Sequence, residues 1–444
     1  MYTILLLLFC IAFIIVASTR FKLHPFLALL AASLLFGIFS GLPLDELIKT
    51  INDGFGGTIG GIGIIIIAGL IIGTFLEKSG GAYTLANLVL KVIGPKRVHM
   101  AMGFIGYFVS IPVFADSGFI IVSPLNRALT KKAKLSLAGT AVALSLGLMA
   151  SHTMVPPTPG PIAAAGILGA DLGQVILFGL MTSVPALLVC ILFAKKIGSK
   201  IFIDPAPKLT EEQINTQLKN APSVFKSFIP IVVPIILIVL RSFAEYPTMP
   251  FGDGTFKYAI GFVGNPVVAL LIGMVLSFTL PKKLDKEMLS TSGWIGEALT
   301  SAAIIILITG AGGAFGKVLQ TSDISSLLEN NVSNGNLGIW LPFLIAAGIK
   351  TAQGSSTVAI ITTASIIAPL MPAMGFDTEV SKALAVIAIG AGASLVSHAN
   401  DSFFWVVTQM SDMKVNQGYR THSLGTAILG FSAMIVLTII SLII

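Results

Sequence analysis

Charged residues are scarce in this chain of 444 residues: Asp, Glu, Lys and Arg together make up 11% of it, less than half of the roughly 25% that is usual in soluble domains. Hydrophobic residues make up 55%, and 45 glycines add to the apolar share. A folded soluble protein of this size could not cover its surface with so few charges. This composition excludes soluble enzymes, nucleic-acid-binding proteins and disordered chains, and it predicts an all-α polytopic membrane protein that contacts lipid.

Several reactive motifs are absent as well. The two cysteines, Cys10 and Cys190, lie in separate apolar stretches with no CxxC pair, so the sequence predicts neither a disulfide nor a metal site. No HExxH motif is present, and the glycine-rich segment at 311–318 departs from a P-loop because Ala311 and Val318 replace required residues. No basic stretch precedes the first apolar run, so we expect a retained span rather than a cleaved signal peptide. We therefore predict a protein that is not an enzyme and needs no cofactor.

Apolar runs long enough to cross a bilayer occur along the whole chain. We predict helical spans at 3–18, 24–42, 58–76, 135–150, 172–194, 227–243, 258–280, 297–312, 380–396 and 423–444. Two further apolar regions, 98–130 and 336–372, are interrupted in the middle by polar and small residues. Each is too long for one span and too broken for two, which predicts two re-entrant hairpins.

The basic residues predict an orientation. Lys and Arg gather in short loops between the apolar runs and give a net charge of +7. All basic clusters fall on one face of the membrane if each hairpin enters and leaves on one side, and the positive-inside rule makes that face cytoplasmic. We therefore predict that the first hairpin opens to the cytoplasm and the second to the exterior, with both termini outside the cytoplasmic (inner) membrane of a bacterium.

The two halves of the chain resemble each other. Three short motifs recur at a nearly constant spacing: Gly73–Ser79 with Gly316–Ser322, Ser123–Leu125 with Ala368–Leu370, and Ser151–Thr153 with Ser397–Ala399. The predicted topology gives the two copies opposite orientations, and inverted repeats with broken helices are typical of secondary transporters. We predict an N-terminal transmembrane repeat at 1–194, a cytoplasmic linker at 195–226 and a C-terminal transmembrane repeat at 227–444.

Four polar interruptions fall inside apolar territory, at 114–118, 151–161, 350–357 and 397–402. The second holds four prolines within six residues, through which no helix continues. Irregular backbone at membrane depth is tolerated only where protein buries it or where it lines a wet cavity. We therefore predict two broken transmembrane helices beside the hairpins; a turn at the membrane surface is the alternative for the second interruption.

Two carboxylates are candidates for proton coupling. Asp116 lies in the first interruption with no basic residue beside it in the sequence. A carboxylate in hydrocarbon is costly, so we expect it to pair, to face water or to carry a proton. Two interpretations stay open for Asp116, a coupling residue and a structural carboxylate that caps a half-helix. Asp401, in the fourth interruption, is the second coupling candidate.

The third interruption is the main candidate for anion binding. Gln353–Thr357 precedes an apolar run, which predicts the N-terminus of a half-helix, where free N–H groups and the helix dipole favour a carboxylate. Lys350 either adds charge there or lies at the hairpin mouth. His152 and His398 are either packing residues or groups that bind substrate hydroxyls or relay a proton. The predicted substrate-binding residues are Ser117, Ser151, His152, Thr153, Gln353, Gly354, Ser355, Ser356, Thr357, Ser397, His398 and Asn400.

At these interruptions the sequence resembles the gluconate permease family, the gluconate:proton symporters that also include permeases for related sugar acids and D-serine. The resemblance rests on Pro112–Phe119, Ser151–Pro161, Gln353–Ala359 and Ser397–Trp405. It runs the whole length of the chain and implies uptake of a small organic anion, gluconate first, with protons. The family is similar to a wider group of ion transporters with paired hairpins, which implies a homodimer and an elevator-like movement.

Several alternatives stay open at this point. Within the family, D-serine, glycerate, idonate and ketogluconate are alternative substrates. Sodium is the alternative coupling ion, because hairpin loops with free carbonyls can cage it. A passive channel and a membrane-embedded enzyme are less well supported, since the chain has paired hairpins and shows no nucleophile–base pair.

Overall fold

The computed structural model describes residues 2–94, 96–205, 221–245, 251, 254–322 and 338–444. Every regular element in this part of the chain is a helix, which confirms the predicted all-α class. The elements are α1 (Tyr2–Thr19), α2 (Pro25–Phe39), α3 (Leu44–Lys78), α4 (Gly81–Ile93), α5 (Val98–Ser110), α6 (Ala115–Lys132), α7 (Leu137–Met154), α8 (Pro159–Leu168), α9 (Leu172–Lys196), η1 (Gly198–Lys200), α11 (Val224–Ala244), α12 (Thr255–Val263), α13 (Pro266–Ser277), α14 (Trp294–Thr321), α16 (Trp340–Gln353), α17 (Ser356–Ile367), η2 (Ala368–Leu370), α18 (Glu379–Ala393), α19 (Ser402–Met410), α20 (Val415–Gly418), η3 (Tyr419–Ser423) and α21 (Leu424–Ile443).

Each predicted span corresponds to one of these helices, with two corrections. Helix α3 begins at Leu44, well before the predicted start at residue 58, because the polar first turns still carry an apolar face. The predicted span at 258–280 is not one straight helix, because α12 and α13 occupy it and are bent by 61°. Pro266 stands at the first position of α13 and cannot continue α12, while the Asn265 side chain accepts a hydrogen bond from Val267 and caps the new helix.

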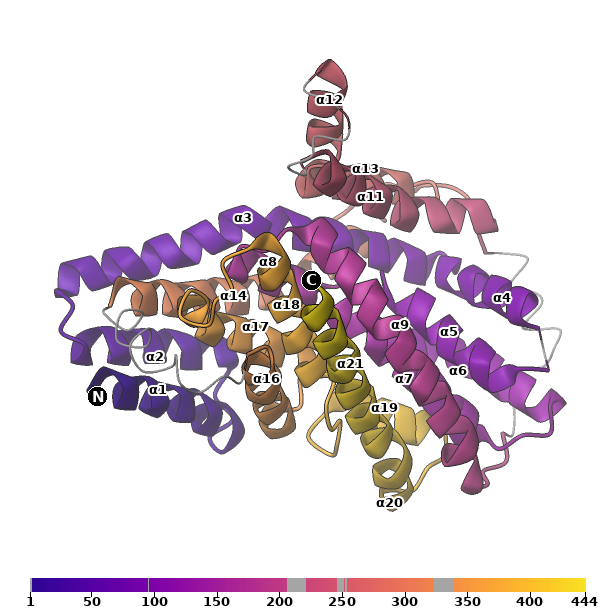
Figure 1. The fold of residues 1–444 in the computed structure, drawn as a ribbon. Coiled ribbons are helices and arrows are strands. Elements are labelled where there is room, and N and C mark those ends of the chain that lie inside the picture. The colour runs from indigo at the N-terminus through magenta and orange to yellow at the C-terminus, as the bar shows by residue number, and fades with distance from the viewer. Residues whose placement is uncertain (1, 95, 206–220, 246–250, 252–253, 323–337) are drawn as a thin grey trace.

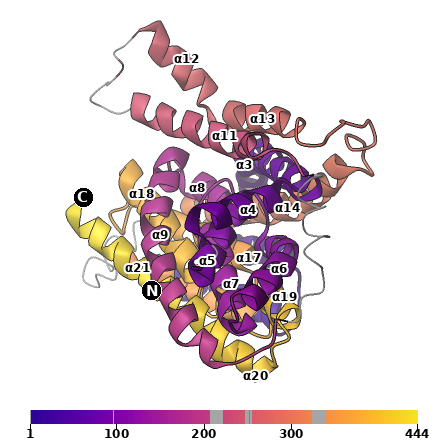
Figure 2. The same ribbon diagram turned by 90° about the vertical axis from the view of Figure 1, so that its right-hand side faces the viewer.

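The described residues contain six helical segments that are long and apolar enough to cross a bilayer, and the bent pair α12/α13 would make a seventh. Helices α3 and α14 run along each other, and α11, α12 and α13 stand to one side of the rest (Figures 1 and 2). Gly54 of α3 lies directly against the backbone of Gly313 of α14. Small residues at such a crossing let two helices approach closely in lipid.

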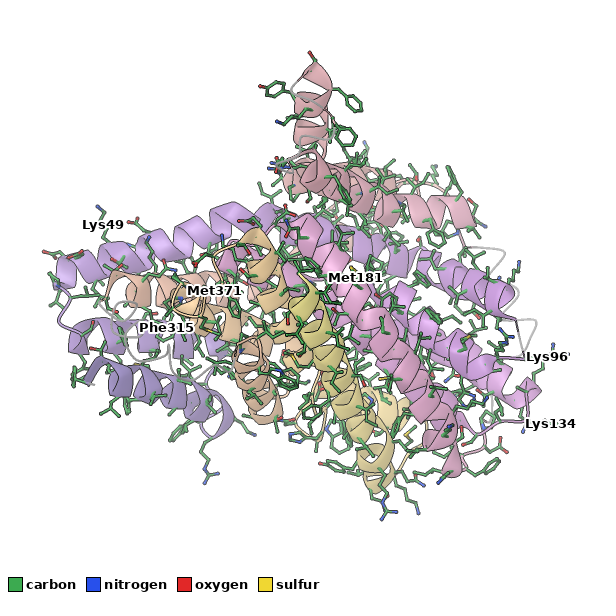
Figure 3. All side chains as sticks on the ribbon, viewed as in Figure 1. Lys49, Lys96, Lys134, Met181, Phe315 and Met371 are labelled. Atoms are coloured by element: carbon green, nitrogen blue, oxygen red, sulfur yellow. The ribbon has the colours of Figure 1, made fainter. Side chains whose placement is uncertain are left out.

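Helix pairs stand where the hairpins were predicted. In α5/α6 the turn covers residues 111–114, and in α16/α17 it consists of Gly354 and Ser355; the arms of each pair pack on each other. Lys96, which precedes α5, and Lys132, at the end of α6, line the same cavity, and Figure 3 shows Lys96 and Lys134 at the same end of the molecule. Both ends of the first pair therefore lie together, as a re-entrant hairpin requires. The course of both pairs through a bilayer stays a prediction.

The predicted helix breaks are present, the first narrower and the second slightly wider than expected. The break between α7 and α8 covers only residues 155–158, so Ser151–Thr153 is still helical and Pro159 starts α8. The break between α18 and α19 covers residues 394–401. His152 thus lies inside a helix and His398 in a loop, so the two histidines do not occupy equivalent places. In the predicted linker 195–226, residues 206–220 lie outside the described residues, and the division into two inverted repeats stays a prediction.

Candidate functional site

One cavity of about 570 Å³ lies where the two helix pairs and the two broken helices meet. Its polar wall comes from the starts of α6, α17 and α19 and from His152 of α7, and its apolar wall from α14. The residues around it are Phe114, Ala115, Asp116, Ser117, Met149, His152, Ile304, Ile305, Ile308, Gln353, Gly354, Ser355, Ser356, Thr357, Val358, Ile361, Asn400, Asp401, Ser402 and Phe403. The cavity therefore draws on both halves of the chain.

Three helix N-termini converge on this cavity. The first residues of α6, α17 and α19, which are Ala115, Ser356 and Ser402, all line it. A helix N-terminus carries roughly half a positive charge and unpaired backbone N–H groups. Three of them around one space favour an anion there.

The N-termini of α6 and α19 hold carboxylates of the protein itself. Asp116 stands in the first turn of α6, and Asp401 is the N-cap of α19, where its Oδ1 accepts a hydrogen bond of 3.0 Å from the backbone N–H of Phe403. At α17 the cap is the hydroxyl of Ser355, which accepts from the N–H of Val358. Among the three, α17 is thus the helix whose start has no carboxylate.

Gly354 forms the tight turn in front of α17. Its φ is +86°, in the left-handed region that favours glycine, and a Cβ there would lie 2.2 Å from the carbonyl oxygen of Asn400. The tip of the second helix pair therefore packs backbone against backbone on the loop that precedes α19. The turn of the first pair packs in the same way on Gly73 of α3, where a Cβ would lie 2.1 Å from the carbonyl oxygen of Pro112.

A buried ion pair stands directly behind the cavity wall. The ammonium of Lys350, with 1% of its side chain exposed, lies 2.6 Å from Oδ2 of Asp401 and also donates to the carbonyl of Gly354. The hydroxyl of Ser397 donates to the same carboxylate oxygen. Ser397 is in turn bonded to Nε2 of His422 at 3.1 Å, and Nδ1 of His422 is bonded to the Ser145 hydroxyl of α7 at 3.0 Å. A continuous polar chain thus joins the two halves.

Asp116 has a different environment. Its Oδ2 accepts a hydrogen bond of 3.0 Å from the hydroxyl of Ser402, at the start of α19. No ion pair to Asp116 is formed within the described part of the chain. The ring of Phe119, one turn further along α6, packs edge to face on the ring of Phe403, which directly follows Ser402.

Some polar atoms of the cavity have no partner. Nδ1 of His152 and both side-chain polar atoms of Gln353 are buried and form no hydrogen bond with any residue that the structure describes. Buried polar groups are nearly always paired in folded proteins, and an unpaired one costs free energy. His152 and Gln353 both line the cavity, so a hydroxylated ligand in it would supply the missing partners.

The structure brings together ten of the fourteen residues that the sequence suggested. They are Asp116, Ser117, His152, Gln353, Gly354, Ser355, Ser356, Thr357, Asn400 and Asp401. The other four do not line the cavity. The hydroxyls of Ser151 and Thr153 donate to carbonyls of their own helix, Ser397 lies behind Asp401, and Nε2 of His398 is bonded to the carbonyl of Thr351 at 2.8 Å.

The sequence did not reveal several members of the site. Ser402 was part of the fourth interruption but not a candidate, and the isoleucines of α14 that form the apolar wall looked like any other span. Lys350 was noticed, yet its pairing with Asp401 spans 51 residues and leaves no local signal. Glu77, at the end of α3, lies near Ser117, while its neighbour Lys78 pairs with Glu297 at 2.7 Å.

Comparisons with known proteins agree with this architecture. The family model described as GntP family permease matches residues 2–443. A gluconate permease of Pseudomonas aeruginosa is 33% identical over 100% of this chain and 98% of that protein. The D-serine transporter DsdX of Escherichia coli is 32% identical over 96% of both chains. The solved structure of Neisseria gonorrhoeae MtrF has a TM-score of 0.61 at 16% identity, over 89% of this chain and 84% of that chain, and is thus similar in fold.

Proposed function

The chain belongs to the GntP permease family, and on that premise we propose that it takes up a small hydroxylated monocarboxylate, gluconate first, together with protons. Membership confirms the resemblance noted from the sequence and makes the chain a multi-pass membrane transporter rather than an enzyme. The observation that carries the substrate class is the cavity onto which the starts of α6, α17 and α19 converge.

The charge and polarity of the cavity suggest how the substrate lies. Because carboxylates of the protein already occupy the starts of α6 and α19, the substrate carboxylate binds at Ser355–Thr357 on α17. Its hydroxyls pair with Gln353 and His152, whose polar atoms are otherwise unpaired. Its carbon chain lies along the isoleucines of α14. The cavity volume of about 570 Å³ is in the range usual for small-molecule sites.

D-serine is the second candidate substrate. A transporter for it is 32% identical to this chain, and its ammonium group would need a carboxylate that is not already paired. Asp116 offers one, since its carboxylate accepts a hydroxyl hydrogen bond but no ion pair among the described residues. Other sugar acids such as idonate differ from gluconate only in the pattern of hydroxyls.

Asp116 and Asp401 are the two candidates for the coupling proton, and sodium held by loop carbonyls is the alternative coupling ion. In this proposal the transporter is a homodimer in the cytoplasmic (inner) membrane of a bacterium, with both termini outside. Labelling of a single cysteine placed near residue 2 by a membrane-impermeant reagent in whole cells tests the orientation, and lack of labelling contradicts it.

Transport by the purified protein in liposomes tests the function. Labelled gluconate is offered under an inward proton gradient and, separately, under an inward sodium gradient, with an excess of unlabelled D-serine as competitor. Accumulation driven by protons and resistant to D-serine is the expected result. Accumulation with sodium alone contradicts proton coupling, and transport of D-serine in place of gluconate contradicts the substrate.

A further inference from the structure

We propose that the two site carboxylates have separate roles: Asp116 carries the coupling proton, whereas Asp401 stays ionised as the fixed partner of the positioning residue Lys350. This inference rests on the proton symport proposed above and assigns the coupling proton to one carboxylate. Neither the sequence nor membership of the family distinguishes the two carboxylates. Their hydrogen-bond partners do.

Every partner of Asp401 favours its ionised form. Lys350 lies 2.6 Å away, Ser397 donates its hydroxyl, and the N–H of Phe403 donates at 3.0 Å. An ammonium can only donate, so a proton on Asp401 would leave the buried charge of Lys350 without its counter-ion. Uncompensated charge at such depth is strongly unfavourable. The pair is therefore stable only with Asp401 charged.

The hydrogen-bond partner of Asp116 is compatible with both the ionised and the protonated form of its carboxyl group. A hydroxyl can donate or accept, so the 3.0 Å contact with Ser402 survives when Asp116 gains a proton. The other charged or titratable groups around Asp116 are Asp401 and Lys350, which act across the cavity, His152 in the same cavity wall, and Glu77 beside Ser117. None of them forms an ion pair with Asp116 among the described residues.

The charge of the site changes little when an anion and a proton enter together. Three helix N-termini of about half a positive charge each, with Lys350 and two carboxylates, leave the empty site slightly positive. A bound monocarboxylate alone would make it negative in a low-dielectric space. One proton on Asp116 returns the site to its starting charge, so anion and proton favour each other's binding.

Lys350 also positions the anion-binding turn. Its ammonium bonds to the carbonyl of Gly354, directly before the start of α17, and to Asp401, the cap of α19. The ion pair thus holds the turn between α16 and α17 against the loop that precedes α19. Loss of Lys350 would release Gly354 and shift the N–H groups of Ser355–Thr357.

Proton uptake on gluconate binding tests this division of roles. The purified protein in weakly buffered detergent is titrated with gluconate while a pH indicator counts protons, and binding is measured from pH 6 to 8. Wild type is expected to take up about one proton per bound gluconate, as linkage requires. The variant D116N should bind with no proton uptake and with an affinity independent of pH. In liposomes it should exchange gluconate but not accumulate it.

The variants of the ion pair should behave differently. D401N and K350Q should lower the thermal stability and weaken gluconate binding about tenfold, while each bound gluconate still brings about one proton. The double variant K350Q/D401N should regain stability, because no charge is left unpaired, but not affinity, because Gly354 is still released. K382Q, which removes a lysine from the partly exposed pair with Glu379, is the matched control and should behave as wild type.

Each contrary outcome has a distinct meaning. Proton uptake that persists in D116N, or that is lost in D401N, overturns the division of roles and leaves the symport intact. A double variant with wild-type affinity overturns the positioning role of Lys350. Wild-type protein that binds gluconate without any proton contradicts the proposed symport itself, and the role of Asp116 falls with it.

Discussion

Replacement of Gly354 by alanine tests whether the tip of the second helix pair must lie against the loop before α19. The residue has a φ of +86°, and the added Cβ would lie 2.2 Å from the carbonyl oxygen and 2.7 Å from the carbonyl carbon of Asn400. The left-handed conformation costs alanine roughly 1–2 kcal/mol, and overpacking typically adds about 1–3 kcal/mol. Both neighbours are backbone, so the clash is relieved only if the tip moves away.

Such a movement should affect binding more than folding. The carbonyl of Gly354 is held by Lys350, and the residues after it form the proposed anion site. If about 1–3 kcal/mol is lost from the binding-competent arrangement, gluconate affinity falls between about 5-fold and 150-fold. Isothermal titration with the purified variant measures the affinity, and a thermal melt of the same sample measures stability.

Gly375→Ala is the matched control. Gly375 also has a positive φ, +72°, but nothing lies within 4 Å of its added Cβ. It therefore bears the conformational cost without the clash, and its gluconate affinity should equal that of wild type. Equal affinities of the Gly354 and Gly375 variants would refute the close packing of the tip on Asn400.

Two further substitutions separate stability from binding. Arg127→Met removes a buried guanidinium that donates to the carbonyls of Pro205 and Met410. The carbonyls left unpaired should lower the stability by about 2–4 kcal/mol in a thermal melt. The control Lys131→Met, which breaks an exposed ion pair, should cost about 0–1 kcal/mol, and equal losses in the two variants would contradict the argument. Gln353→Leu removes a buried amide that has no partner among the described residues, so the stability should stay the same or rise. The gluconate affinity should fall about tenfold, which corresponds to the loss of about one hydrogen bond. An unchanged affinity would exclude Gln353 from the site.

Local chemistry explains which parts of the fold the sequence predicts. Proline clusters and polar residues inside apolar runs interrupt helices whatever surrounds them, so the breaks before α8 and α19 could be located to within a few residues. The bend between α12 and α13 has a local cause as well, in Asn265 and Pro266, but the apolar run continues on both sides and conceals it. An apolar run therefore predicts burial in lipid better than it predicts a straight helix.

The angular position of a side chain on its helix explains why the sequence predicts only some of the residues that line the cavity. Ser151, His152 and Thr153 form one polar group in the sequence, yet α7 continues through all three, and consecutive residues on a helix point about 100° apart. His152 faces the cavity, so its two neighbours face elsewhere and bond to their own helix. In Ser355–Thr357, by contrast, all three residues lie in the cap and first turn, where backbone N–H groups as well as side chains face the ligand.

Helices α6 and α19, from opposite halves of the chain, are joined by hydrogen bonds at two places. At their starts the hydroxyl of Ser402 on α19 donates to Asp116 on α6. Further along α6, Arg127 donates to the carbonyl of Met410, at the end of α19, and pairs with Asp412 at 2.8 Å. The two helices thus run parallel, with their positive ends side by side at the cavity. Because Lys350 fastens α19 to the tip before α17, a displacement of one of the three helix starts must carry the other two with it. The proposed anion site should therefore keep its shape if these helices are displaced together.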